Sequence, residues 1–281
     1  MRIIYLIDFN CPYSYIGLER IKKACKRLDL DVEWEMKPFE LEPEAGKRPT
    51  ISITERYAEK YGLSPEEASE RISEIEKIAL DDGLKINFKD IKLTSSKDAL
   101  RLTKFVQSNH PEITLDIVDK IFYSNLVKNE NIADINILAD IAISCGLDES
   151  EARKILENNY YNIEVFLDMD EAISNGITST PCFILNEKEE KLIIPGAFSA
   201  EEFEVALKDF TNGNIKSKTY GFGTLWKTDD KKNYLDNVWL TKSKLTFTIL
   251  AISSIPYPSL SNSITISSVF SSTFLCATLW A

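Results

Sequence analysis

The chain has 281 residues, enough to bury one large domain or a domain with an appendage, and its 44% hydrophobic and 27% charged residues are ordinary for a globular protein. A formal net charge of -11 without a long basic run argues against a nucleic-acid surface, because phosphate binding needs clustered Lys and Arg. Five irregularly spaced cysteines without a Cys-x-x-Cys pair, and a single histidine, predict reduced thiols rather than a disulfide framework or a zinc site.

The first segment predicts a strand, a helix and a second strand. Residues 3–9 are a continuous apolar run, suited to a strand that is buried on both faces. Pro12 stands where a helix would begin, and apolar residues then recur at helical spacing to about residue 28. Residues 31–37 alternate between polar and apolar, which is typical of a half-buried strand. The first apolar run is too short for the core of a signal peptide, so we expect a cytoplasmic protein.

From about residue 50 to residue 175 every strong signal is helical. The segment from Ser64 to Glu67 places a serine at the N-cap, a proline at the first helical position and a carboxylate three residues after the cap. Further helices are predicted over residues 96–108, 112–126, 134–144, 149–158 and 163–174. These segments predict an all-helical insertion over about residues 45–175.

The period of two returns after the helical block. Residues 182–186 and 191–194 predict two strands joined by a charged turn. Ser199 and Glu202 form a second capping box, which opens a helix that runs to about Phe210. The predicted order is therefore β-α-β, a helical block and β-β-α, and the fold class is α/β.

The composition changes after residue 210. Residues 245–281 carry no charge and nine serines. Residues 264–280 are shorter and richer in Ser and Thr than the roughly 20 apolar residues of a membrane span. We therefore expect one domain over residues 1–211 and a poorly packed extension over residues 212–281, with no membrane anchor.

Cys11 is the candidate residue for chemistry. It follows a buried strand and directly precedes Pro12, so it lies at a helix N-terminus, where unpaired N–H groups and a partial positive charge favour the thiolate. The alternative is a buried structural cysteine, because Cys is among the residues most often buried. Pro181, immediately before a predicted strand, is a second candidate, since a proline there can carry a cis peptide in a tight turn.

Taken together, these residues resemble the DsbA-like thioredoxin family, and within it the FrnE-like branch, over roughly residues 3–210. Five segments in matching order carry the resemblance: residues 8–17, 37–43, 95–102, 176–183 and 194–197. The resemblance implies a thioredoxin fold with a large helical insertion, β-α-β … β-β-α. It also implies that Cys11 is the attacking thiolate and that Pro12 and Tyr13 shape its surroundings. Pro181 would be the cis-proline that faces the thiol, and Thr180 would offer backbone groups to an extended peptide or to glutathione.

The sequence departs from the dithiol pattern at Ser14, where a dithiol oxidoreductase carries its second cysteine. The Ser14 hydroxyl can donate a hydrogen bond to the Cys11 thiolate, but it cannot resolve a mixed disulfide. Cys25 lies about 21 Å farther along the helix, beyond disulfide reach. Cys182 is the one remaining substitute, although strand alternation can point it inward. We therefore expect a monothiol site that binds no cofactor tightly and takes an external thiol such as glutathione as co-substrate.

Two other functions stay open. The glutathione-dependent 2-hydroxychromene-2-carboxylate isomerases and kappa-class glutathione transferases are similar through their Ser-Pro-Tyr-Ser-type segments. This chain agrees with them at Pro12, Tyr13 and Ser14 but carries Cys11 where they carry the serine that activates bound glutathione. The second of these other functions is that of a non-catalytic thioredoxin-fold module. The expected partner is a thiol or disulfide substrate, either a protein or glutathione. No binding to nucleic acid or to a membrane is expected, and the formation of a homodimer is left undecided.

Overall fold

The structure is a computed structural model, and it describes residues 1–187 and 190–214. The extension predicted over residues 212–281 therefore lies almost wholly outside the described residues. Within the described part, no helix combines the length and the apolar character that crossing a bilayer would require.

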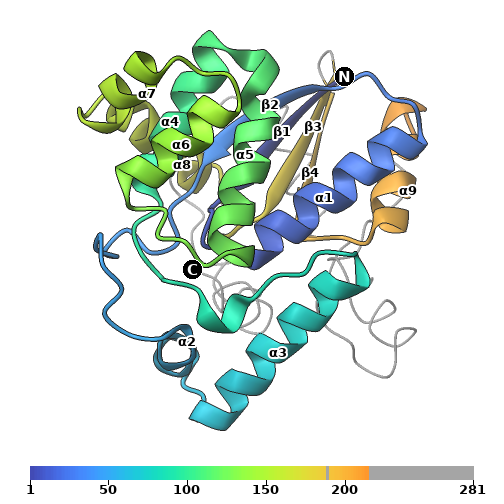
Figure 1. The fold of residues 1–281 in the computed structure, drawn as a ribbon. Helices are drawn as coiled ribbons and strands as arrows, with labels where there is room; N and C mark the ends of the chain where they lie inside the picture. The colour runs from blue at the N-terminus through green and yellow to red at the C-terminus, as the bar shows by residue number, and fades with distance from the viewer. Residues whose placement is uncertain (188–189, 215–281) are drawn as a thin grey trace, which may run out of the picture.

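A four-stranded mixed sheet carries the site (Figure 1). Its strands, in chain order, are β1 (Arg2–Ile7), β2 (Glu33–Pro38), β3 (Cys182–Glu187) and β4 (Glu190–Pro195). The spatial order is β2-β1-β3-β4, in which β1 pairs parallel with β2 and antiparallel with β3, and β3 pairs antiparallel with β4. The sheet therefore combines strands from the two ends of the described chain.

Two helices from the ends of the domain pack side by side, α1 (Pro12–Arg27) and α9 (Ala200–Thr211). They share the main core with Ile3, Tyr5 and Ile7 of β1, which point to one face of the sheet. On the other face, Leu6 and Cys182 belong to a smaller apolar cluster. The alternation of β1 thus separates two cores.

The helical insertion connects β2 to β3. Its α-helices are α2 (Ile53–Tyr61), α3 (Pro65–Asp81), α4 (Lys97–Asn109), α5 (Thr114–Phe122), α6 (Ile135–Ser144), α7 (Glu149–Leu156) and α8 (Asn162–Ser174). The chain continues from α5 directly into a π-helical turn, Tyr123–Val127. The predicted capping box at the start of α3 is confirmed, because Ser64 Oγ accepts from the Glu67 N–H and Glu67 accepts from the Ser64 N–H.

The predicted α/β class and the order of strands and helices are confirmed, with two differences. The first strand ends at Ile7 rather than residue 9, because the Asp8 carboxylate accepts the Asn10 N–H at 3.0 Å and turns the chain out of the sheet. The predicted helices also omit α2, whose N-cap Ser52 forms a capping box with Glu55. The Ser-x-x-Glu spacing at 52–55 is a signal by which the sequence could have identified this helix.

Candidate active site

Cys11 is the N-cap residue of α1, as the sequence predicts. Its backbone is extended, its N–H donates to the Asp8 carbonyl at 3.0 Å, and its own carbonyl accepts the Ser14 N–H at 3.0 Å. Pro12 occupies the first helical turn, where a missing N–H costs nothing. The strand end, the tight turn and the helix start therefore fix the backbone of Cys11 on both sides.

The structure brings Cys11 together with the second predicted site segment. The Thr180–Pro181 peptide bond is cis, and Cys11 Sγ donates to the Thr180 carbonyl at 3.6 Å across 169 residues of sequence. Gly17 makes this approach possible, because a Cβ built there would lie 3.1 Å from Pro181 Cγ. The sequence reasoning did not identify this role of Gly17.

The Cys11 thiol is buried, with 1% of the residue exposed. Burial raises the pKa of the thiol and is the largest influence, the side chains of Ser14 and Thr180 lower the pKa, and the charge of nearby Asp8 raises it further. The net direction is upward, opposite to the effect of a helix N-terminus alone. The sequence prediction considered the helix end and not the burial of the thiol.

Tyrosines of α1 and α2 lie near enough to Cys11 to interact with it electrostatically. Tyr13 and Tyr57 are buried in the same core cluster as Cys11. The Tyr57 ring lies edge-on to Tyr61 at 5.1 Å and to Phe88 at 5.7 Å between centroids. Tyr57 therefore belongs to a group of rings in the insertion that shares its core with Cys11.

An ion pair holds this part of the insertion against α1. Arg20 of α1 donates from Nε to Asp82, which follows α3, at 2.7 Å, and from Nη1 to the Ala197 carbonyl at 2.9 Å. The Arg20 side chain is only 8% exposed, so water screens the pair weakly. One residue thereby links α1, α3 and the segment before α9.

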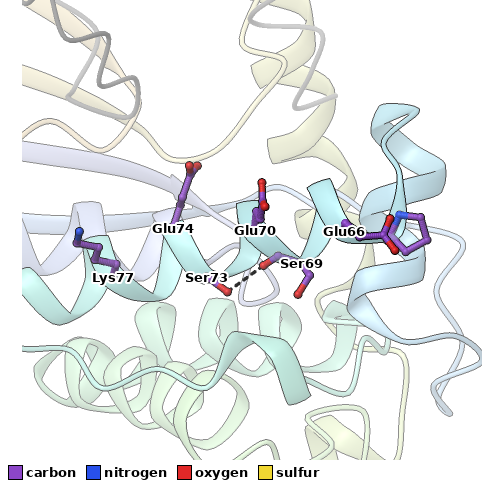
Figure 2. A pocket seen from close by; sticks show the side chains of 7 residues that line it. Glu66, Ser69, Glu70, Ser73, Glu74 and Lys77 are labelled. Carbon is purple, nitrogen blue, oxygen red and sulfur yellow. Dashed lines mark hydrogen bonds between the residues drawn. The ribbon is translucent and has the colours of Figure 1, made fainter.

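A hollow follows the outer face of α3, and Figure 2 shows its lining. The lining residues all belong to this helix: Pro65, Glu66, Ser69, Glu70, Ser73, Glu74 and Lys77. Ser73 donates to the Ser69 carbonyl at 2.9 Å within the helix. Among the described residues, the lining contains neither a thiol nor any of the predicted site residues, so this hollow is not the candidate active site.

Buried polar side chains surround the loop that leads to Cys11. The Asp8 carboxylate accepts the N–H groups of Asn10, at 3.0 Å, and Leu41, at 2.7 Å. Burial raises the pKa of Asp8, and these two backbone hydrogen bonds lower it. Polar residues directly after an apolar strand and directly before Cys11 were a signal that the sequence contained and the prediction did not use.

The other described cysteines lie away from this arrangement. Cys25 is buried in the second half of α1, and burial raises its pKa to about 12. Cys182 pairs in register with Leu6 and shares the smaller apolar cluster on the sheet face opposite the cluster of Cys11, where burial raises its pKa to about 12. Both thiols are therefore protonated at neutral pH, and neither shares a described contact with Cys11.

Comparisons with known proteins identify the family and agree with the fold. The family model of the DSBA-like thioredoxin domain matches residues 2–208. The uncharacterised protein YwbO of Bacillus subtilis (strain 168) is 27% identical over 209 residues, which cover 72% of this chain and 93% of that protein. The crystal structure of a probable DsbA oxidoreductase from Streptomyces coelicolor is 28% identical, with a TM-score of 0.68, and the match covers 78% of this chain and 92% of that one.

A more distant structure shares the fold alone. The cytosolic disulfide reductase DsbM from Pseudomonas aeruginosa, solved with GSH, is 12% identical with a TM-score of 0.54. The match covers 75% of this chain and 100% of that one.

Proposed function

Because the chain belongs to the DSBA-like thioredoxin domain family, we propose that it exchanges thiols and disulfides, as an oxidoreductase or isomerase, through Cys11 alone. The observation that carries the proposal is the 3.6 Å contact between Cys11 Sγ and the Thr180 carbonyl beside the cis Pro181. A substrate disulfide placed against this loop would meet the only side-chain sulfur that the described part of the chain sets beside it. Ser14, and no second thiol, faces Cys11 from the first turn of α1.

The reaction needs two external thiols for each disulfide that is reduced. The Cys11 thiolate attacks one sulfur of the substrate disulfide, forms a new S–S bond and releases the other sulfur as a thiolate, which takes up a proton. One external thiolate then attacks the Cys11 sulfur of the mixed disulfide and releases the second substrate sulfur as a thiolate, which takes up a proton, so Cys11 is now joined to the external thiol. A second external thiolate attacks the external sulfur of this disulfide, breaks its bond to Cys11 and releases the reduced Cys11. The substrate gains two electrons, and the two external thiols lose two electrons and join in one disulfide.

We propose glutathione as the external thiol. The shared fold of the disulfide reductase that was solved with GSH supports this choice. Ser14 supports it too, because a site without its own resolving thiol needs a mobile one. Cys11 is buried, so it must become accessible for the reaction.

Oxidised glutathione tests the proposal directly. We expect the wild-type protein to gain one glutathionyl group at Cys11, located by peptide mapping and mass spectrometry, and to reduce a model disulfide when reduced glutathione is supplied. Cys11→Ser should lose both properties, whereas the matched control Cys25→Ser, on the same helix, should keep them. A wild-type protein that forms no adduct at Cys11 and reduces no disulfide would contradict the proposal. Conjugation or isomerisation activity in its place would favour the glutathione-dependent transferase or isomerase.

The burial of Cys11 favours a second candidate, a non-catalytic module of the same fold. A thiol that is 1% exposed and whose pKa is raised is typical of a structural cysteine. The pH dependence of Cys11 alkylation separates the two candidates. An active thiol should react measurably at neutral pH in the native protein, and a structural one should react only when the protein unfolds.

A further inference from the structure

The π-helical turn Tyr123–Val127 places a buried amide beneath the loop that carries Cys11. Asn125 lies in the middle of this turn and is completely buried. A π turn contains one more residue than an α turn, so it rotates the side chains that follow and is often found at functional sites. If α5 continued as a regular α-helix, the side chain at position 125 would therefore point in a different direction.

Both donors of the Asn125 amide serve the active-site loop. Nδ2 donates to the Phe9 carbonyl at 3.0 Å and to Asn10 Oδ1 at 3.1 Å. Asn10 in turn donates from its Nδ2 to the Thr94 carbonyl at 2.8 Å. The loop between β1 and α1 is thus tied to two separate segments of the helical insertion.

The side-chain carbonyl oxygen of Asn125 accepts no hydrogen bond from the described residues. This oxygen, Oδ1, is buried. A buried polar atom without a partner is destabilising, so an amide is not the side chain that packing alone would favour here. An apolar side chain of similar size could not supply the two hydrogen bonds to Phe9 and Asn10.

The loop transmits this restraint to the sulfur. The Cys11 N–H donates to the Asp8 carbonyl at 3.0 Å, so the backbone of Cys11 moves with the loop. The sulfur then meets Thr180 at 3.6 Å, a contact between distant segments that a small shift of the loop would change. A misplacement of about 1 Å can slow a reaction about a hundredfold.

We propose that Asn125 is a positioning residue for Cys11: its two hydrogen bonds to the loop set where the thiol stands relative to the Thr180 carbonyl and to Ser14. The inference rests on the proposed function for its kinetic consequence. Its structural part, the placement of the thiol, can be measured independently of any activity.

Asn125→Asp tests the proposal with almost no change of shape. The substitution replaces the Nδ2 donor by an oxygen that would face the Phe9 carbonyl and Asn10 Oδ1, so both hydrogen bonds are lost. We expect the pKa of Cys11 to rise, because the loop loosens and a carboxyl group comes near. We also expect disulfide exchange to slow by about tenfold or more at neutral pH. The pH profile of Cys11 alkylation and the exchange rate with glutathione measure the two effects.

Asn129→Asp is the matched control. Asn129 follows the same turn, but its Nδ2 donates to the Asn87 carbonyl at 2.7 Å and to the backbone carbonyl of Asn125 at 3.5 Å, and makes no described contact with residues 8–11. Its φ of 54° is one that Asp also tolerates. We expect this variant to leave the alkylation profile and the exchange rate unchanged, even if its thermal midpoint falls.

The outcomes separate the inference from the proposed function. If the wild type exchanges disulfides and Asn125→Asp keeps both its rate and its alkylation profile, or if Asn129→Asp changes them equally, Asn125 has no positioning role. If the wild type exchanges no disulfide but Asn125→Asp shifts the Cys11 profile, the proposed function fails and the positioning role stands. Should Asn125→Asp not fold, Asn125→Ser keeps one shorter donor and is expected to show the same shift in smaller measure; an unshifted profile in that folded variant overturns the proposal.

Discussion

At Cys11, the helix terminus and the protein interior act on the same thiol in opposite directions. The N-terminal N–H groups of α1 and the hydrogen bond with Ser14 favour the thiolate, whereas burial favours the neutral thiol. Burial dominates in this conformation, so the pKa is raised. A conformation that exposes Cys11 would remove the effect of burial on the pKa, and the helix N-terminus would then lower the pKa. The reactivity of the thiol would therefore depend on how often Cys11 becomes exposed.

Ser14 is the residue whose replacement should change the chemistry most. Its N–H donates to the Cys11 carbonyl at 3.0 Å, so residues 11 and 14 face each other across the first turn of α1. Ser14→Cys is therefore expected to form an internal disulfide with Cys11 under mild oxidation. Disulfide reduction should then depend less on the concentration of glutathione, because the second thiol is supplied by the protein. Counting free thiols and measuring the rate against glutathione concentration check this. A variant that keeps both thiols free under oxidation would contradict it.

Glu40 is expected to make the stability of the protein depend on pH. Burial, and next the charge of Asp8, raise its pKa from 4.5 to about 7, and its Oε1 is buried without a hydrogen-bond partner among the described residues. The folded protein therefore holds a proton that the unfolded chain releases between these two values, so stability falls as the pH rises through this window. Glu40→Gln removes the free-energy cost of a charged carboxylate at this buried position. We expect it to stabilise the protein by about 1–2 kcal/mol at about pH 8, after discounting for partial exposure, and to change little at about pH 5.

Denaturant unfolding at the two pH values measures this difference, with Glu44→Gln as the control. Glu44 is exposed on the same segment and should show no pH-dependent effect. Equal effects of Glu40→Gln at both pH values would show that the carboxyl titrates normally.

Among the elements, α3 is joined to α1 by a buried ion pair in addition to the apolar core that the two helices share. Asp82→Ala leaves the Arg20 guanidinium buried with the Ala197 carbonyl and without its carboxylate. We expect a loss of about 2–3 kcal/mol, because an unpaired buried charge is costly, and faster alkylation of Cys11, because α3 and the tyrosines near it are released. Thermal unfolding and the alkylation rate measure the two effects.

The exposed pair of Arg27 and Glu204, at 2.7 Å between α1 and α9, provides the comparison. Glu204→Ala should cost less than about 1 kcal/mol and leave Cys11 unchanged. If Asp82→Ala destabilises the protein without changing the reactivity of Cys11, then α3 does not control access to the thiol.

How far the sequence predicts this structure differs between kinds of element. The strands and most helices follow from short-range patterns such as the apolar run before Asp8 and the capping box at Ser64, and these predictions are confirmed. The meeting of Cys11 with Pro181 followed from a resemblance and not from periodicity, since 169 residues separate Cys11 from Thr180. The burial of the Cys11 thiol could not be predicted, because it depends on how the helical insertion packs against α1. The contact of Asn125 with the loop likewise needs the π turn, which leaves no pattern of apolar residues.

At the scale of the whole molecule, the described residues 1–187 and 190–214 contain the complete β-α-β … β-β-α order. The last helix buries Phe210 against the main core, and the family match ends at residue 208. We expect a chain that ends at Asn214 to fold with a thermal midpoint close to that of the full chain and to form the same glutathione adduct at Cys11. Loss of cooperative unfolding or of the adduct would show that residues 215–281 belong to the domain.

The position of β1 at the centre of the sheet affects how the protein is made. One edge of β1 is covered by β2, which follows within 40 residues, but the other edge waits for β3, which begins at Cys182. A ribosome therefore releases Cys11 long before the Thr180 carbonyl exists to meet its sulfur. During that interval the strand has an open edge and the thiol is free in solution. During synthesis the chain therefore passes through a stage that lacks both the β3 pairing and the Thr180 contact of Cys11, and this stage ends when the sheet is complete.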